Sequence, residues 1–270
     1  MGLILCSQEP VKRPFYIENL GLHIYSSQEL CYVIFQYPLI AMDNFIGESL
    51  IGFIKSELGM GLLALKLERR ISHGEDIEDL LLMILQECDY YSVREISQFQ
   101  KKVSVLLAMN PADYAKVKAD DLSDRKQYGK AIVQYQLLLN NQGENFQRPK
   151  WRGEVWNNLG VIYTRLFQFE KGLEAFCHAY DYLSDVNILK QIFVTTLLQK
   201  DLVLDEKYQE MISEEQRIEW EQEVSQLKTE VQESEEWREL EETFHRDSIQ
   251  RRTQTEQMLE KWKENYRHMV

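Results

Sequence analysis

Residues 155–185 read VWNNLGVIYTRLFQFEKGLEAFCHAYDYLSD, and the spacing within this stretch decides the expected fold. Large and small apolar residues recur at i, i+3, i+4 and i+7, the spacing of one helix face: Trp156, Leu159, Gly160 and Tyr163. After the segment FQFE, a second helix repeats the arrangement with Gly172, Phe176 and Ala179. Small residues let two antiparallel helices approach closely, while aromatic residues fill the space beside them. Because such a hairpin cannot bury its apolar surface alone, we expect it to stack on neighbouring hairpins.

This pattern resembles the tetratricopeptide repeat (TPR) family. The family's large-x-x-Leu-Gly-x-x-Tyr motif, followed by small, aromatic and Ala positions, matches the stretch above. The sequence departs from the family at Gly172, where Ala is usual, and at Ser184, where Pro is frequent. The resemblance implies a helix–turn–helix unit that is stacked with further copies.

Two weaker copies flank this unit. Upstream, QYGKAIVQYQLLL is similar to the second half of a TPR unit, with Ala131 and Tyr135 in the expected positions. Downstream, a step of about 34 residues reaches the large, small and large positions of a third copy, at Phe193, Val194 and Leu197. The similarity therefore covers about 111–200 and predicts a short solenoid, since three stacked units suffice for stability.

The rest of the chain also favours helices, and we expect an all-α protein in three parts. Residues 1–110 are predicted to form a helical bundle with a small β-hairpin over 13–26, and 111–210 the TPR-like repeats. Residues 211–270 are predicted to form a long charged helix or a helical hairpin. Predicted capping boxes mark three helix starts: Ser26 with Glu29, Ser92 with Glu95, and Ser213 with Gln216.

Charge divides the C-terminal part into two halves. Residues 214–242 hold twelve acids and three bases, a net charge of −9, whereas 243–270 hold six bases and four acids, a net charge of +2. One interpretation is a single solvated helix that packs along the end of the repeats. The alternative is a helical hairpin or an antiparallel homodimer, with the acidic half facing the basic half. Trp220, Trp237 and Trp262 predict contact surfaces on these helices, because burying aromatic area is favourable.

Composition argues against several classes of partner. The net charge of −13 disfavours sequence-independent binding to nucleic acid phosphates and docking on an anionic membrane surface. The N-terminal MGLILC is too short for a signal peptide, and Cys6 stands where a myristoylation motif has Ser or Thr. We therefore expect a cytoplasmic protein that does not bind nucleic acid or membrane.

Residues able to do chemistry are scattered. The five histidines do not form an i, i+4 pair, and the four cysteines lack the spacing of a metal site. The neighbours Cys177 and His178 point to different faces of a helix, which disfavours a catalytic pair. We expect no catalytic residue, no metal and no cofactor.

The TPR resemblance implies a partner-binding groove formed by the first helix of each unit. It assigns seven residues to the groove wall or its neighbourhood: Asn157, Asn158, Val161, Thr164, Arg165, Gln191 and Thr195. Asn side chains suit this role because they can bond a peptide backbone as donor and as acceptor. Arg165, a local positive charge, is expected to favour an acidic or carboxyl-bearing segment. The expected partner is another protein or a peptide segment.

Two alternatives remain open. One is a co-chaperone that holds the tail of Hsp70 or Hsp90, because Lys116 and Asn158 match the carboxylate clamp of such TPR proteins. Asp120 replaces one Asn of that clamp, and Ile188 and Ile192 stand where its last Lys and Arg would be. The other alternative is a regulatory sensor that binds a peptide or small ligand between the bundle and the repeats.

Overall fold

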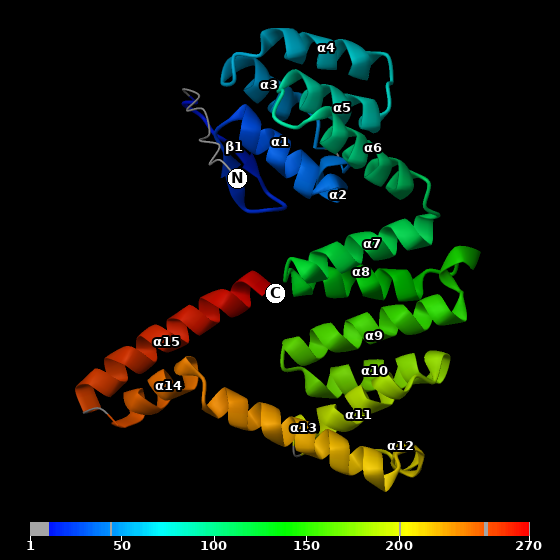
Figure 1. The fold of residues 1–270 in the computed structure, drawn as a ribbon, viewed down its shortest axis with the longest axis vertical. Coiled ribbons are helices and arrows are strands. Elements are labelled where there is room, and N and C mark those ends of the chain that lie inside the picture. Colours follow the sequence, from blue (N-terminus) through cyan, green and yellow to red (C-terminus); the bar gives the residue numbers. More distant parts are fainter. Residues whose placement is uncertain (1–10, 44, 200, 246–247, 270) are drawn as a thin grey trace. The chain divides into compact units, whose positions relative to one another are not determined.

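The computed structural model describes residues 11–43, 45–199, 201–245 and 248–269. The expectation about MGLILC lies outside these residues. Over these residues the fold is all-α except for one two-stranded sheet. The chain divides into two compact units, residues 1–109 and 110–270 (Figure 1). In the described ranges, no helix combines the length and the apolar character needed to cross a membrane.

The first unit contains two short strands and six helices in its described residues. In chain order they are β1 Phe15–Ile17, β2 Leu22–Ile24, α1 Ser27–Gln36, α2 Pro38–Ala41, α3 Glu48–Ser56, α4 Gly61–Ser72, α5 Ile77–Glu87 and α6 Val93–Leu107. The strands form the predicted antiparallel hairpin, with Tyr16 opposite His23. Ile17 and Ile24 are buried in the core of the unit, so the hairpin is stabilised by the helices beneath it.

Helix α5 is the central helix of this unit. All six residues from Leu80 to Leu85 are buried, and α5 contacts α1, α4 and α6. A helix that is apolar on all sides over such a stretch has to be surrounded by other elements. The apolar run LLLMIL therefore sets the centre of the bundle.

The predicted capping boxes at Ser92 and Ser213 are both present, with reciprocal side-chain and backbone hydrogen bonds. At the start of α1 only half of the predicted box forms. Ser26 Oγ accepts a hydrogen bond from the Glu29 amide, but the Glu29 carboxylate accepts from the amide of Tyr25 and not from that of Ser26.

The second unit is built from helices. They are α7 Pro111–Asp124, α8 Tyr128–Asn140, the 3₁₀ turn η1 Glu144–Phe146, α9 Pro149–Arg165, α10 Phe169–Leu183, α11 Val186–Leu198, α12 Glu206–Met211, α13 Glu214–Gln232, α14 Glu235–His245 and α15 Ser248–Met269. Helices α7 to α10 form two antiparallel hairpins that stack side by side (Figure 1).

The α9–α10 hairpin packs closely because glycines lie in its contact surface. A methyl group added at Gly160 would lie 2.6 Å from the ring of Phe176, and one added at Gly172 would lie 2.7 Å from Cγ2 of Thr164. A side chain at either glycine would push the helices apart. Gly160 and Gly172 are therefore needed for the close packing of α9 on α10.

The two hairpins use the same turn, 41 positions apart. Lys126 and Phe167 each adopt a left-handed backbone with φ of 59°. In both turns the next residue, Gln127 or Gln168, donates its amide to a carbonyl five residues earlier, at 2.9 and 2.8 Å. The same offset relates Tyr135 on α8 to Phe176 on α10, and both side chains are buried. The chain thus contains an internal structural repeat.

Helix α11 lies in the region where the sequence predicts a third repeat copy. Phe193 on α11 is buried, and its ring lies 5.8 Å from that of Trp220 on α13. The helix that directly follows α11 in the chain, α12, has only 6 residues. Helix α13 therefore packs on α11 and belongs to the same compact unit as the hairpins.

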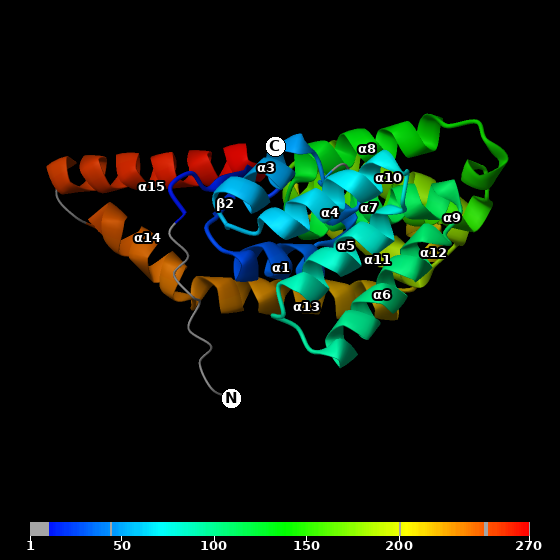
Figure 2. The ribbon, with the colours of Figure 1, turned by 90° about the horizontal axis from the view of Figure 1, so that it is seen from above.

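The interpretation of the C-terminal part as one continuous helix is wrong. Helix α13 ends at Gln232, and α14 begins two residues after Glu233 because Ser234 Oγ accepts a hydrogen bond from the amide of Trp237. Helices α14 and α15 contact each other, and Thr243 is buried with its hydroxyl 4.0 Å from Sδ of Met258. From this contact α15 runs back toward α7 and α8, where Met269 packs against the core of the hairpins (Figures 1 and 2).

Candidate functional site

Two adjoining hollows lie along the first helices of the hairpins, and together we call them the groove. The Tyr135 hollow, of about 340 Å³, is lined by Asp120, Ser123, Asp124, Tyr135, Asn158, Val161 and Arg165. The Gln191 hollow, of about 280 Å³, is lined by Lys116, Glu154, Asn157, Asn158, Leu183, Asp185, Asn187, Ile188 and Gln191. The hollows adjoin at Asn158, which lines both. Helices α7, α9 and α11 supply most of the wall.

Asp120 is the centre of a hydrogen-bond network in this groove. Its Oδ1 accepts from the Tyr135 hydroxyl at 2.5 Å and from Asn158 Nδ2 at 2.9 Å. Its Oδ2 pairs with Lys116 Nζ at 2.9 Å. Burial and the hydrogen bond to Asp120 raise the pKa of Tyr135, so the phenol keeps its proton and acts as the donor. The network ties α7, α8 and α9 together.

The same network occupies the donors of the predicted carboxylate clamp. Lys116 and Asn158 are the two residues that match the clamp, and both bind Asp120. A carboxylate from this chain therefore sits where a ligand's carboxylate would be bound. An incoming carboxylate would have to displace Asp120 and would be repelled by it.

The sequence predicts Arg165 as a local positive charge open to a partner, but in the structure its guanidinium contacts Tyr128. Its guanidinium donates a hydrogen bond to the Tyr128 hydroxyl at 3.2 Å and lies 5.8 Å from the centre of the Tyr128 ring. Among the described residues no carboxylate pairs with it. Arg165 lines the Tyr135 hollow, but part of its hydrogen-bonding capacity is already used on α8.

Two amides of the Gln191 hollow have unpaired acceptors. Oδ1 of Asn157 and Oε1 of Gln191 are buried, and neither finds a hydrogen-bond donor within the described residues. An unsatisfied buried acceptor costs about 1–3 kcal/mol. These two atoms are therefore positions where a donor from a bound segment would be favourable after a small rotation of the amide.

Thr164 and Thr195 were predicted to lie in the groove wall, and they line neither hollow. Thr164 Oγ1 donates to the Gly160 carbonyl at 3.1 Å, and its methyl group faces Gly172. Thr195 is buried and donates to the Gln191 carbonyl at 2.6 Å. Both hydroxyls bond within their own helix, a common arrangement for Thr, and both side chains serve helix packing.

The charge of the groove also differs from the expectation. Four acidic residues line it, Asp120, Asp124, Glu154 and Asp185, against two basic ones, Lys116 and Arg165. Lys116 and Asp120 neutralise each other. The sequence prediction weighed Arg165 and Asp120 but not the other three acids, because the four come from two helices, α7 and α9, and from the loop before α11. The groove is net acidic, and this argues against an acidic segment as its occupant.

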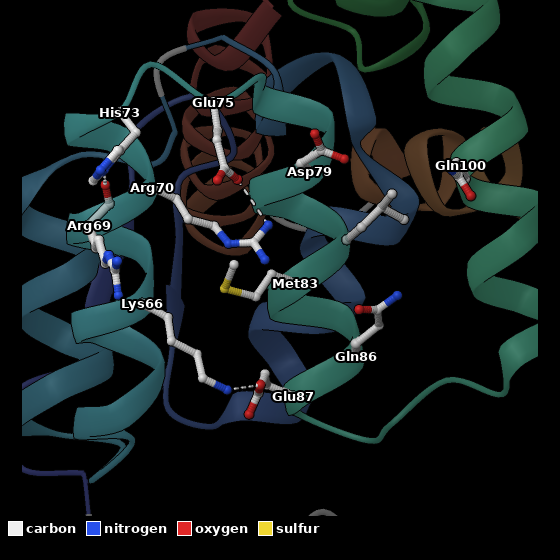
Figure 3. Close-up of a pocket in the computed structure, with 11 residues that line it drawn as sticks. Lys66, Arg69, Arg70, His73, Glu75, Asp79, Met83, Gln86, Glu87 and Gln100 are labelled. Carbon is white, nitrogen blue, oxygen red and sulfur yellow. Dashed lines mark hydrogen bonds and ion pairs between the residues drawn. The ribbon is translucent and has the colours of Figure 1, made fainter.

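A separate polar cleft of about 730 Å³ lies within the first unit (Figure 3). Helix α4 and its C-cap residue supply the basic side chains: Lys66, Arg69, Arg70 and His73. Glu75, Asp79 and Glu87 face them, and ion pairs join Lys66 to Glu87 at 2.5 Å and Arg70 to Glu75 at 2.9 Å. Figure 3 shows both pairs crossing the cleft, with Met83 between them. The four basic residues follow at i, i+3, i+4 and i+7, a helical spacing in the sequence that indicates a common face.

The Cys177–His178 pair is engaged in packing. The His178 ring lies 4.5 Å from that of Trp156, and burial raises the pKa of the Cys177 thiol. A raised pKa leaves less of the reactive thiolate at neutral pH. Within the described residues, no cluster of three or more His, Cys, Asp or Glu side chains has the arrangement of a metal site.

Comparisons of the chain with known proteins do not assign a family. No protein-family model, curated protein or solved structure matches it.

Proposed function

We propose that this chain is a non-enzymatic adaptor that holds an extended segment of a partner protein in the groove of its second unit. The observation that carries the proposal is that two hollows adjoin at Asn158 and are lined mostly by α7, α9 and α11. A row of successive first helices offers side chains at regular intervals to one extended ligand. The residue pattern at 155–185 and the repeated turn at Lys126 and Phe167 support a TPR-like unit.

Polar side chains of the groove suit a peptide backbone. Asn157, Asn158 and Gln191 are amides, which offer donors and acceptors to main-chain N–H and C=O groups. The unpaired acceptors of Asn157 and Gln191 match the N–H groups of an extended segment. Val161 and Ile188 add apolar contact area.

Electrostatics favours a basic segment as the occupant. Asp124 and Glu154 form no ion pair in the described part of the chain, and they lie in different hollows. Lys or Arg side chains of a partner would therefore meet unpaired carboxylates at two places along the groove. For the same reason the co-chaperone alternative has less support, since the acidic tail of an Hsp70 or Hsp90 protein would be repelled.

The experiment is partner capture from the native cell with charge-reversed protein. Asp124→Lys with Glu154→Lys should abolish capture of the partners that the unaltered chain retains. The matched control is Glu144→Lys with Glu174→Lys, which makes the same change in net charge at exposed positions outside the groove. Equal loss in both double variants would show a general charge effect, and unchanged capture in the groove variant would exclude the groove.

A second candidate function is sensing of a small polar ligand by the cleft of the first unit. Its volume of about 730 Å³ lies in the range of small-molecule sites. The basic and acidic side chains balance one another, so the cleft does not select one sign of charge. A ligand that raises the melting temperature of the unaltered chain, but not of Arg69→Ala, would support this function over the adaptor.

A further inference from the structure

The apolar stripe of α13 extends beyond the surface that covers it. Four residues follow at i, i+4, i+7 and i+11: Trp220, Val224, Leu227 and Val231. Trp220 and Val224 are buried, and nearby Lys190 of α11 pairs with Glu223 at 2.5 Å. Leu227 and Val231, further along the same stripe, are 59% and 56% exposed. The chain thus buries the first half of the stripe and leaves the second half in solvent.

A second uncovered stripe lies on α15. Leu259, Trp262 and Tyr266 follow at i, i+3 and i+7, and they are 43%, 50% and 43% exposed. Helix α15 spans 22 residues, which corresponds to a length of about 33 Å. A half-exposed Trp between two other large side chains is an unusual surface for solvent, since burying aromatic area is worth kilocalories. The helix therefore presents an apolar face with nothing on it.

The charges beside the two stripes are complementary. Helices α13 and α14 belong to the segment with a net charge of −9, and α15 to the segment with a net charge of +2. The ion pairs of α15 in the described residues stay within that helix, between Arg252 and Glu256 and between Arg267 and Glu260. Lys261 and Lys263 flank Trp262 without a carboxylate partner in the described residues. The carboxylates of Glu230 and Glu233, on either side of Val231, form no ion pair there, although the Glu233 carbonyl accepts from Arg238.

We propose that two copies of this chain associate through their C-terminal helices, with the α15 stripe of each copy packed on the uncovered half of the α13 stripe of the other. A second copy is favoured over a different protein because one chain carries both halves of the complementary pair. In a two-fold symmetric dimer each copy must supply both surfaces, because the contact of α15 with α13 then forms twice. The interaction does not form within one chain, because Leu227 and Val231 are more than half exposed.

The first test is sedimentation velocity of the full chain over a range of concentrations. The expected result is a concentration-dependent dimer that weakens as salt rises from about 0.05 to 0.5 M, because the flanking charges are screened. Leu259→Glu with Trp262→Glu should raise the dimer dissociation constant by about ten-fold or more. A chain that stays monomeric throughout, or a dimer that this variant does not weaken, would overturn the proposal.

The second test fixes which helices meet. One variant carries Lys261→Glu and Lys263→Glu, and the other carries Glu230→Lys and Glu233→Lys. Each should be monomeric alone, but an equimolar mixture should dimerise, because the acidic α15 of one meets the basic α13 of the other and the native pairing forms at the second contact. Lys101→Glu with Lys102→Glu, on exposed residues of α6, is the matched control and should still dimerise. Failure of the mixture to dimerise, with both variants folded by circular dichroism, would contradict the pairing of α15 with α13.

Discussion

Gly160 on α9 lies directly under the ring of Phe176 on α10, so that a β-carbon at Gly160 would be 2.6 Å from Cδ1 and Cε1 of that ring. The ring is surrounded by other atoms and cannot move away easily, because Phe176 is only 2% exposed. Two helices approach closely here only because one of them lacks a side chain at the point of contact.

Replacing Gly160 with Ala should therefore destabilise the second unit. We expect the free energy of unfolding to fall by about 1–3 kcal/mol, the usual effect of overpacking, and to fall further for Gly160→Leu. Urea unfolding followed by circular dichroism measures the change. Gly52 on α3 is the matched control, because it is exposed and has no atom within 4 Å of a β-carbon. There, Gly52→Ala should raise stability by about 0.5–1 kcal/mol, and equal stability of Gly160→Ala and the unaltered chain would show that the α9–α10 contact is looser than described.

Removing the hydroxyl of Tyr135 should weaken the network at Asp120. Tyr135→Phe deletes one of three donors to this carboxylate, and we expect a loss of about 1–3 kcal/mol because hydrogen bonds to charged groups are the stronger ones. Asp120→Ala should cost more, since it leaves Lys116, Tyr135 and Asn158 without their acceptor. The order of the two melting temperatures is the readout. Tyr135→Phe melting below Asp120→Ala would contradict the central role of Asp120.

The ion pair of Asp113 and Arg148 should make a small part of the stability depend on pH. The hydrogen bond from Arg148 lowers the pKa of Asp113 below its usual value of 3.8, and burial opposes this only in part. Because the folded pKa is depressed, the contribution is fully present above the unfolded value and is lost as pH falls through the folded one. Both side chains are more than a third exposed, so we expect at most about 1 kcal/mol.

The corresponding measurement compares Asp113→Asn with the unaltered chain by urea unfolding at pH 7 and at about pH 3. The variant should be less stable at pH 7, and the difference should shrink at the lower pH. Asp124→Asn serves as the control on the same helix, because Asp124 is exposed and no ion pair to it is described. A difference for Asp113→Asn that grows at low pH would show that the sign is wrong.

Arg165 should reveal the charge of the groove's occupant. If the partner segment is basic, Arg165→Glu removes a repulsive charge and should strengthen binding several-fold, whereas Asn157→Ala removes an amide and should weaken it. Isothermal titration with a captured partner peptide measures both changes. Weaker binding by Arg165→Glu would instead support the acidic segment expected from the sequence. Arg165→Gln controls for the lost contact with Tyr128, since it removes this contact without adding a negative charge.

Much of the fold could be predicted because its determinants are local. The capping boxes at Ser92 and Ser213 each involve residues three positions apart, and the hairpin of Phe15–Ile17 with Leu22–Ile24 needs only a short turn. The apolar faces of α9 and α10 could also be predicted, because helical spacing alone puts Gly160 on one face and Phe176 on the other. The TPR resemblance assigned Asn157, Asn158 and Val161 to the groove, and these three residues line the two hollows.

Only the tertiary structure decided how the groove is charged and where the C-terminal chain turns. Asp120 and Asn158 are 38 positions apart, so the spacing within either helix does not show that they bond. Arg165 bonds to Tyr128 of another helix, a contact that the spacing within α9 does not predict. The hydroxyls of Thr164 and Thr195 bond to carbonyls of their own helices, and the pattern of residues on a helix face does not distinguish this role from a place in the groove. A single serine can either continue a helix or cap the next one, and in this chain Ser234 caps α14, which packs on α15. Short-range periodicity thus fixed the helices and their apolar faces, whereas the partners of each polar side chain depended on which helices the fold brought together.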